Sequence, residues 1–241
     1  MSVERGPWSV ERGPEGLSLH TPRPTLHGLR PGGLELTDRA LAFIALPAAA
    51  RVWDIGCGTG ATAARLAGLG MRSCGLDRSR ARLAEAVSGS ASAGFVRGSA
   101  DKLPCAAESL DAVFAECVWS VCAPDGAALD EWRRVLKPGG WLVLSDVYAL
   151  APQAQPPDLL ATACWRRLPA EYEVRAALRE RSLEILLWED HAAALRAYAA
   201  QLLWTHGSLA QLLGADADQP ETRAALNATR PSYFLLVAQK R

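Results

Sequence analysis

Three glycines and one carboxylate stand close together in residues 52–60, Val-Trp-Asp-Ile-Gly-Cys-Gly-Thr-Gly. Glycine is required where a ligand approaches the backbone closely and where a turn adopts conformations that are costly for other residues. Gly56, Gly58 and Ala61 would satisfy a loose dinucleotide fingerprint, so the glycines alone do not select a ligand. Asp54 does, because a carboxylate just before the turn would repel a pyrophosphate and attract an ammonium or sulfonium group.

A second carboxylate, Asp77, follows 21 residues after Gly56. At the end of a second strand, a carboxylate in this position can accept hydrogen bonds from both hydroxyls of a ribose. Asp77 alone fits NAD or an adenosyl ligand, whereas Asp54 and Asp77 together favour an adenosyl ligand with a positive charge. The alternative is a strand-to-helix turn whose carboxylates only cap the backbone.

Strand and helix patterns alternate from residue 34 onward, and these elements must position both carboxylates. We expect strands at residues 51–54, 73–77, 95–97, 110–116 and 141–146, and helices at 34–45, 60–69, 79–87 and 127–136, the first with Thr37 as its N-cap. Such alternation is typical of a doubly wound, mostly parallel α/β sheet with helices on both faces. In that fold, ligands bind at the carboxyl ends of the strands, where Asp54 and Asp77 are predicted.

The two ends of the chain differ from this pattern. Residues 1–33 are dense in proline and glycine, which predicts an irregular arm. We expect one domain from residue 34 to residue 241, with a helical elaboration at about 151–230. In this last third the patterns predict helices at 158–166, 171–179 and 191–204 and strands at 183–188 and 233–239.

Taken in order, these segments resemble the motifs of class I S-adenosylmethionine-dependent methyltransferases. Residues 54–60 resemble the family's first motif, 75–77 the second, 98–104 the adenine loop, 110–116 the fourth motif and 136–140 the turn before the fifth strand. The resemblance implies a Rossmann-like, seven-stranded sheet in the order 3-2-1-4-5-7-6, with the seventh strand antiparallel. It also implies that S-adenosylmethionine is the cofactor and S-adenosylhomocysteine the product.

By this resemblance, several separate segments would bind the cofactor. The methionine and ribose would contact Asp54, Gly56, Cys57, Gly58, Gly60, Asp77 and Arg78, and the adenine would contact Ser99, Ala100 and Asp101. Relatives often carry Asp where Ser99 stands, so either Ser99 or Asp101 would bind the adenine amino group here. Glu116, at the end of the fourth strand, would face the cofactor or the reacting methyl group.

Cysteines are the candidate residues for holding the methyl acceptor. Cys117 directly follows the fourth strand, Cys122 is five residues later, and Cys164 lies in the region after the fifth strand. Around Cys117 the chain resembles arsenite methyltransferases, in which cysteines ligate trivalent arsenic, and soft thiolates suit such a centre. We therefore take Cys117, Cys164 and Glu116 as candidate catalytic residues. The alternative is burial in the core, which is usual for cysteine; the spacing fits no zinc motif, and we expect no metal site.

The composition limits the class of protein. The 241 residues are 49% hydrophobic, and 26 basic residues balance 26 acidic ones. This balance argues against a nucleic-acid binder, whose affinity comes mainly from neutralising phosphates. No apolar run reaches the roughly 20 residues that span a bilayer, no secretory signal opens the chain, and six cysteines in such a chain point to a reducing cytosol. We therefore expect a cytoplasmic enzyme that methylates a small molecule, with arsenite-type methylation and a non-catalytic cofactor-binding module as alternatives.

Overall fold

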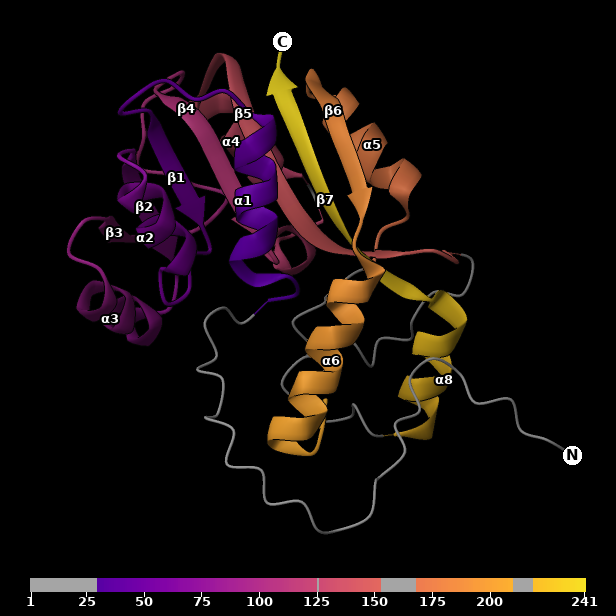
Figure 1. The fold of residues 1–241 in the computed structure, drawn as a ribbon. Helices are drawn as coiled ribbons and strands as arrows, with labels where there is room; N and C mark the ends of the chain where they lie inside the picture. The colour runs from indigo at the N-terminus through magenta and orange to yellow at the C-terminus, as the bar shows by residue number, and fades with distance from the viewer. Residues whose placement is uncertain (1–29, 125, 153–167, 210–218) are drawn as a thin grey trace, which may run out of the picture.

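A seven-stranded sheet forms the centre of the protein. The computed structural model describes residues 30–124, 126–152, 168–209 and 219–241 (Figure 1). The strand order is β3-β2-β1-β4-β5-β7-β6, which confirms the expected fold. Neighbouring strands are parallel from β3 to β5, and β7 runs antiparallel to both β5 and β6. The strands are β1 (Arg51–Ile55), β2 (Arg72–Asp77), β3 (Gly94–Arg97), β4 (Leu110–Glu116), β5 (Leu136–Ala149), β6 (Leu183–Asp190) and β7 (Pro231–Lys240).

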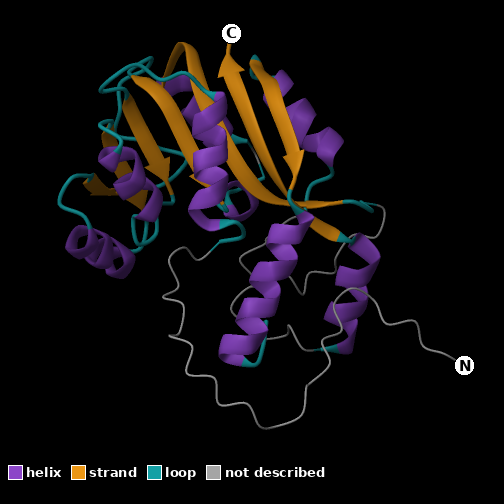
Figure 2. Ribbon diagram, viewed as in Figure 1, coloured by secondary structure: helices purple, strands orange, loops and turns teal. Residues whose placement is uncertain are grey.

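Helices cover both faces of this sheet (Figure 2). Residues of α1 and α2 pack on one face and residues of α4 and α5 on the other. Helices α6 and α8 extend beyond the carboxyl ends of the parallel strands, at the bottom of Figure 1. The helices are α1 (Gly33–Phe43), α2 (Ala61–Gly68), α3 (Arg80–Gly89), α4 (Ala127–Val135), α5 (Glu171–Arg179), α6 (Ala192–His206) and α8 (Pro220–Thr229), with a short 3-10 helix at Trp119–Val121.

The buried apolar runs of the central strands explain this layering. In β4, Val113 and Ala115 face the α4 side, while Ala112 and Phe114 face the α1 side, and all four are fully buried. A strand that alternates between two covered faces reads as a continuous apolar run rather than as an apolar-polar alternation. The sheet is therefore held between two apolar layers, and Asp54, Asp77 and Glu116 lie near the carboxyl ends of β1, β2 and β4.

Two sequence predictions about elements are wrong. Helix α1 begins after Gly32, whose φ is 73°, and no side chain caps it; Thr37 lies inside the helix, where its hydroxyl is used in a buried tertiary contact described below. Strand β5 begins at Leu136 rather than at Trp141, because Leu136 already pairs with Leu110 of β4. The helix expected at 158–166 lies outside the described residues. Helix α8 was not predicted, although Pro220 at its first turn is a typical helix-start signal.

Candidate active site

A cavity of about 420 Å³ opens at the carboxyl ends of the parallel strands. Its wall comes from the turn after β1, the end of β2, the start of α3, the loop after β3, the segment after β4 and the start of α4. The lining residues are Gly56, Leu76, Asp77, Arg78, Arg82, Gly98, Ser99, Ala100, Asp101, Cys117, Val118, Val121, Cys122, Ala123 and Ala128.

The glycine turn after β1 forms one wall of this cavity. Gly56 has φ of 68°, and a Cβ atom added there would lie 2.3 Å from Cγ2 of Val118. Gly58 has φ of 55° and open space above it, and its N–H donates to Oδ2 of Asp77 at 2.9 Å. The turn therefore needs glycine both for its left-handed backbone and for close packing against the segment after β4.

Asp77, the predicted ribose ligand, lies at the end of β2 in the cavity wall. Its Oδ1 accepts the Ser79 N–H at 2.7 Å and its Oδ2 accepts the Gly58 N–H at 2.9 Å. Each carboxylate oxygen has two acceptor positions, so both can still accept a hydrogen bond from a ligand hydroxyl. These two backbone donors fix the Asp77 carboxylate beside the glycine turn.

Asp54 is buried beside the cavity and is not part of its wall. Its Oδ2 accepts the Ala63 N–H at the start of α2, at 3.1 Å. Burial and the negative charge of Glu116 raise the pKa of Asp54 to about 8, while Arg30 counteracts that rise. A cation placed near Asp54 would favour its ionised form.

Glu116 also stands outside the cavity wall, in a buried polar network. Its Oε1 accepts the Thr37 hydroxyl at 2.8 Å, and its Oε2 accepts the Thr62 hydroxyl at 2.6 Å. Arg30 forms an ion pair with Oε2 at 3.0 Å and donates to the Thr37 hydroxyl at 2.7 Å. Glu116 thus ties Arg30, three residues before the start of α1, to Thr37 of α1 and Thr62 of α2, and its contact with a ligand stays a prediction.

The predicted adenine loop follows β3. Ser99, Ala100 and Asp101 all line the cavity, as does Gly98, whose N–H donates to the Asp77 carbonyl at 3.1 Å. The Lys102 N–H donates to the Ser99 carbonyl at 3.2 Å, which closes a turn. The loop therefore lines the same cavity as Asp77.

Two thiols lie at the other end of the cavity. Cys117 directly follows β4 with φ of 56°, and Cys122 follows the 3-10 helix. The Cys117 sulfur lies 3.0 Å from the Tyr233 hydroxyl, which is also 3.0 Å from the Ser145 hydroxyl. Burial and the charge of Asp146 raise the pKa of the Cys117 thiol well above its ordinary value, so the thiol is neutral at pH 7. Cys164 lies outside the described residues.

Four other residues are predicted from the sequence to bind the cofactor. Arg78 lines the cavity, whereas Cys57, Gly58 and Gly60 are not among its lining residues. Arg82 of α3 also lines it. Its position follows from the direction of α3 after the Ser79 N-cap, which no motif encodes. The sequence did not identify Arg30 and Tyr233 as part of this site, because the residues they contact, Glu116 and Cys117, are far away in the sequence.

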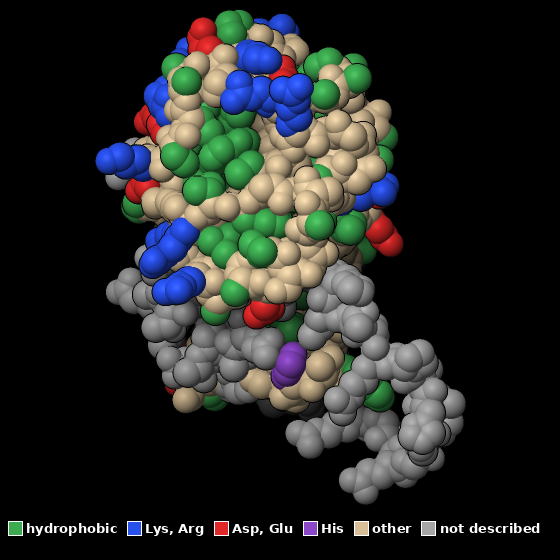
Figure 3. Space-filling model, turned by 90° about the vertical axis from the view of Figure 1, so that its left-hand side faces the viewer, with side chains coloured by type: hydrophobic (Ala, Val, Ile, Leu, Met, Phe, Trp, Pro, Cys, Tyr) green, Lys and Arg blue, Asp and Glu red, His purple; other side chains and the backbone are tan. Residues whose placement is uncertain are grey.

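The described residues contain neither a metal-binding cluster nor a membrane-spanning helix. No group of three or more His, Cys, Asp or Glu side chains among them could hold a metal ion. In the same part of the chain, every helix is too short or too polar to cross a bilayer. On the face in Figure 3, lysine and arginine side chains form separate groups with apolar side chains between them.

The chain resembles several proteins of known class. A family model described as "Methyltransferase domain" matches residues 53–144. The demethylmenaquinone methyltransferase of Beutenbergia cavernae is 38% identical over 96 residues, which are 40% of this chain and 40% of that protein. The arsenite methyltransferase of Halobacterium salinarum is 31% identical over 156 residues, 59% of this chain and 39% of that protein. The match thus spans about 40% of the length of each of these two curated relatives.

A solved structure with the same fold is the [4+2]-cyclase SpnF. It is 26% identical to this chain, with a TM-score of 0.68, and the match covers 86% of this chain and 80% of SpnF. The residues matched by the family model contain the glycine turn, Asp77, the adenine loop and Cys117. The matched segment therefore supplies most of the cavity wall.

Proposed function

Because the chain carries a class I methyltransferase domain, we propose that the 420 Å³ cavity binds S-adenosylmethionine and that a small molecule accepts the methyl group there. One observation carries the proposal. Three separate segments of the sequence that are predicted to bind the cofactor, around Gly56, Asp77 and Ala100, line a single cavity. The volume lies within the range of about 300–1,000 Å³ that small-molecule and cofactor sites occupy.

Each part of the cofactor has a partner of suitable chemistry. Asp77 accepts the ribose hydroxyls, and residues 98–101 receive the adenine. Asp54, buried two residues before Gly56, attracts the ammonium group of the methionine part, and that charge favours the ionised form of a carboxyl whose pKa is otherwise raised to about 8. Gly58 leaves open space for the ligand to approach the backbone.

The reaction needs little from the protein beyond orientation. When bound, S-adenosylmethionine would supply the methyl group: a lone pair of the acceptor would form the new bond to carbon while the carbon–sulfur bond breaks, leaving a neutral thioether. An acceptor that carries a proton releases it to solvent or to a nearby base. Holding the acceptor in line with the carbon–sulfur bond supplies most of the acceleration.

Release of S-adenosylhomocysteine from S-adenosylmethionine tests this proposal. The full chain is incubated with a panel of candidate acceptors and compared with the Asp54→Asn variant and with a control lacking acceptor. Acceptor-dependent release that falls at least about tenfold in the variant supports the proposal, since a hydrogen bond to a charged group is worth about 1.5–3 kcal/mol. A chain that binds the cofactor and releases no product with any acceptor would instead be a cofactor-binding module.

Arsenite is a second candidate acceptor, favoured by the thiols of Cys117 and Cys122 in one cavity wall. Trivalent arsenic prefers soft sulfur ligands, and each As–S bond forms as one As–O bond of arsenite breaks, the hydroxyl leaving with the thiol proton as water. The arsenic lone pair then attacks the methyl carbon without a general base. Arsenite-dependent product release that is lost in Cys117→Ser supports this acceptor, whereas release unchanged by the substitution removes Cys117 from its binding.

A further inference from the structure

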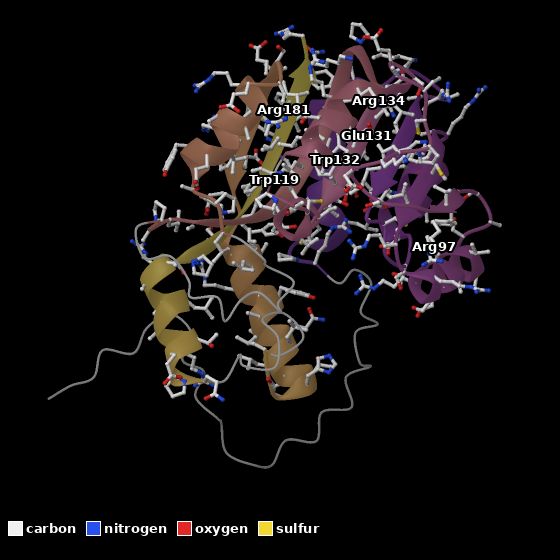
Figure 4. The ribbon with its side chains drawn as sticks, turned by 180° about the vertical axis from the view of Figure 1, so that it is seen from behind. Arg97, Trp119, Glu131, Trp132, Arg134 and Arg181 are labelled. Carbon is white, nitrogen blue, oxygen red and sulfur yellow. The ribbon has the colours of Figure 1, made fainter. Side chains whose placement is uncertain are left out.

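Two buried carboxyl groups lie on the same face of the sheet at the ends of neighbouring strands. Asp54 of β1 is in register with Phe114 of β4, so its side chain lies on the same face as Phe114 and, two residues later, Glu116. This face is the one covered by α1 and α2; the other is covered by α4, whose Trp132 is labelled in Figure 4. Both carboxyl groups therefore lie at the carboxyl ends of the strands, where the cavity opens.

The two carboxyl groups differ in their partners. The hydroxyls of Thr37 and Thr62 donate to the two oxygens of Glu116 at 2.8 and 2.6 Å, and Arg30 forms an ion pair with Glu116 at 3.0 Å. Asp54 accepts one backbone N–H at 3.1 Å, and within the described part of the chain its Oδ1 has no hydrogen-bond partner. Glu116 thus has a cation among its donors, whereas Asp54 can still accept one.

The buried charges around Asp54 are not balanced if it ionises. One guanidinium, that of Arg30, offsets the Glu116 carboxylate, so a second carboxylate would be buried without a counterion. Burial and Glu116 accordingly raise the pKa of Asp54 to about 8, although Arg30 opposes the rise. The charged and titratable groups that face Asp54 are Glu116 of β4, Arg30 before α1, Asp77 of β2 and the thiols of Cys57 and Cys74.

We propose that Arg30 is a positioning residue that neutralises Glu116 and thereby leaves Asp54 to the ammonium group of the ligand, with Asp54 releasing its proton to the solvent as that group binds. The proposal rests on the proposed function, because it assumes a ligand with an amino-acid part in this cavity. The charges then balance in both states. Before binding, Arg30 offsets Glu116 and Asp54 is neutral; after binding, the ammonium group offsets the Asp54 carboxylate.

The number of protons released on binding measures this coupling. S-Adenosylhomocysteine is titrated calorimetrically into the full chain at pH 7 in phosphate and in imidazole buffer, whose ionisation enthalpies differ, and the difference in heat gives the proton count. We expect close to one proton per ligand, since a group with a pKa of about 8 is about nine-tenths protonated at pH 7. Deamino-S-adenosylhomocysteine, which lacks only the amino group, should release none, and S-adenosylhomocysteine should release none from Asp54→Asn.

Variants of Arg30 separate this role from general stabilisation. In Arg30→Met the ammonium group of the ligand is the only cation for two carboxyl groups, so one of them keeps its proton and the release falls toward zero. Arg30→Lys restores a cation and should restore the release. Arg65→Met is the control: it removes the exposed ion pair with Asp38 and should leave the release near one proton.

Three results would overturn the proposal: binding of S-adenosylhomocysteine without proton release, a release that persists in Asp54→Asn, or a release that stays near one proton in Arg30→Met. If Arg30→Met does not fold, the deamino ligand, Asp54→Asn and Arg30→Lys still decide the matter, because all three leave Arg30 or a lysine in place. If the unaltered chain binds neither ligand, the proposed function is wrong and this role of Arg30 is wrong with it.

Discussion

The hydroxyl of Tyr233 lies 3.0 Å from the sulfur of Cys117, although the two residues are 116 positions apart in the sequence. Strand pairing produces this contact: Tyr233 of β7 is in register with Val147 of β5, and the Cys117 N–H donates to the β5 carbonyl of Ser145 at 2.8 Å. Burial keeps both groups neutral by raising the pKa of each. The Cys117 thiol is therefore a hydrogen-bonding group rather than a preformed thiolate.

Alkylation of Cys117 should be slow at pH 7 and should still accelerate above pH 9, because only the thiolate reacts and the thiol pKa is raised. Iodoacetamide labelling followed by peptide mass spectrometry measures the rate at this site, with Cys117→Ser as the control for assignment. A rate that levels off near pH 7 would mean a thiolate at neutral pH, contrary to the effect of burial and of Asp146 on the pKa of this thiol.

Stability should depend on pH through Asp54. Its folded pKa is raised to about 8 by burial and by Glu116, against Arg30, whereas in the unfolded chain the pKa is about 3.9. The folded state therefore binds more protons between these values, and this group makes stability fall as pH rises from about 4 to about 8. Asp54→Asn should remove this fall.

Urea denaturation at several pH values measures this effect. We expect the stability of Asp54→Asn relative to the unaltered chain to increase steadily from pH 5 to pH 8 and then to level off. Two stability profiles that run parallel over this range would show that Asp54 keeps its ordinary pKa in the folded protein.

Glu116→Gln should destabilise the protein by about 3 kcal/mol, because it leaves Arg30 buried without its charged partner. Replacing Arg30 with Met in the same variant should recover part of the loss. The measurement is again urea denaturation, with Arg65→Met, which removes the exposed Arg65–Asp38 pair, as a control expected to change little. Equal effects of Glu116→Gln and Arg65→Met would contradict the buried network.

Gly56→Ala should lower the stability of the fold more than Gly139→Ala does. Both glycines have left-handed backbones, with φ of 68° and 74°, so each alanine costs about 1–2 kcal/mol in backbone strain. Only at Gly56 would the new Cβ collide with Val118, whereas nothing lies within 4 Å at Gly139. Thermal unfolding of the two variants isolates the collision, and equal losses would exclude it.

The parts of this site that are formed by neighbouring residues could be predicted from the sequence, whereas contacts between distant residues could not. Asp77 and the glycine turn could be predicted because a strand, a turn and a helix follow one another directly in the chain. The role of Thr37 could not, since its hydroxyl bonds Glu116, 79 residues away, instead of capping α1. The same holds for Trp132, whose indole meets Ala100 only after α4 packs on the sheet.

The most direct test of the central claim is a calorimetric titration of the full chain with S-adenosylhomocysteine and, separately, with NAD. We predict that the chain binds S-adenosylhomocysteine in preference to NAD. Asp77→Ala should lower the affinity for S-adenosylhomocysteine about tenfold or more, because both ribose hydroxyls lose their acceptor. Circular dichroism confirms that the variant is folded. Preferential binding of NAD, or an affinity for S-adenosylhomocysteine that Asp77→Ala leaves unchanged, would contradict the assignment of this cavity.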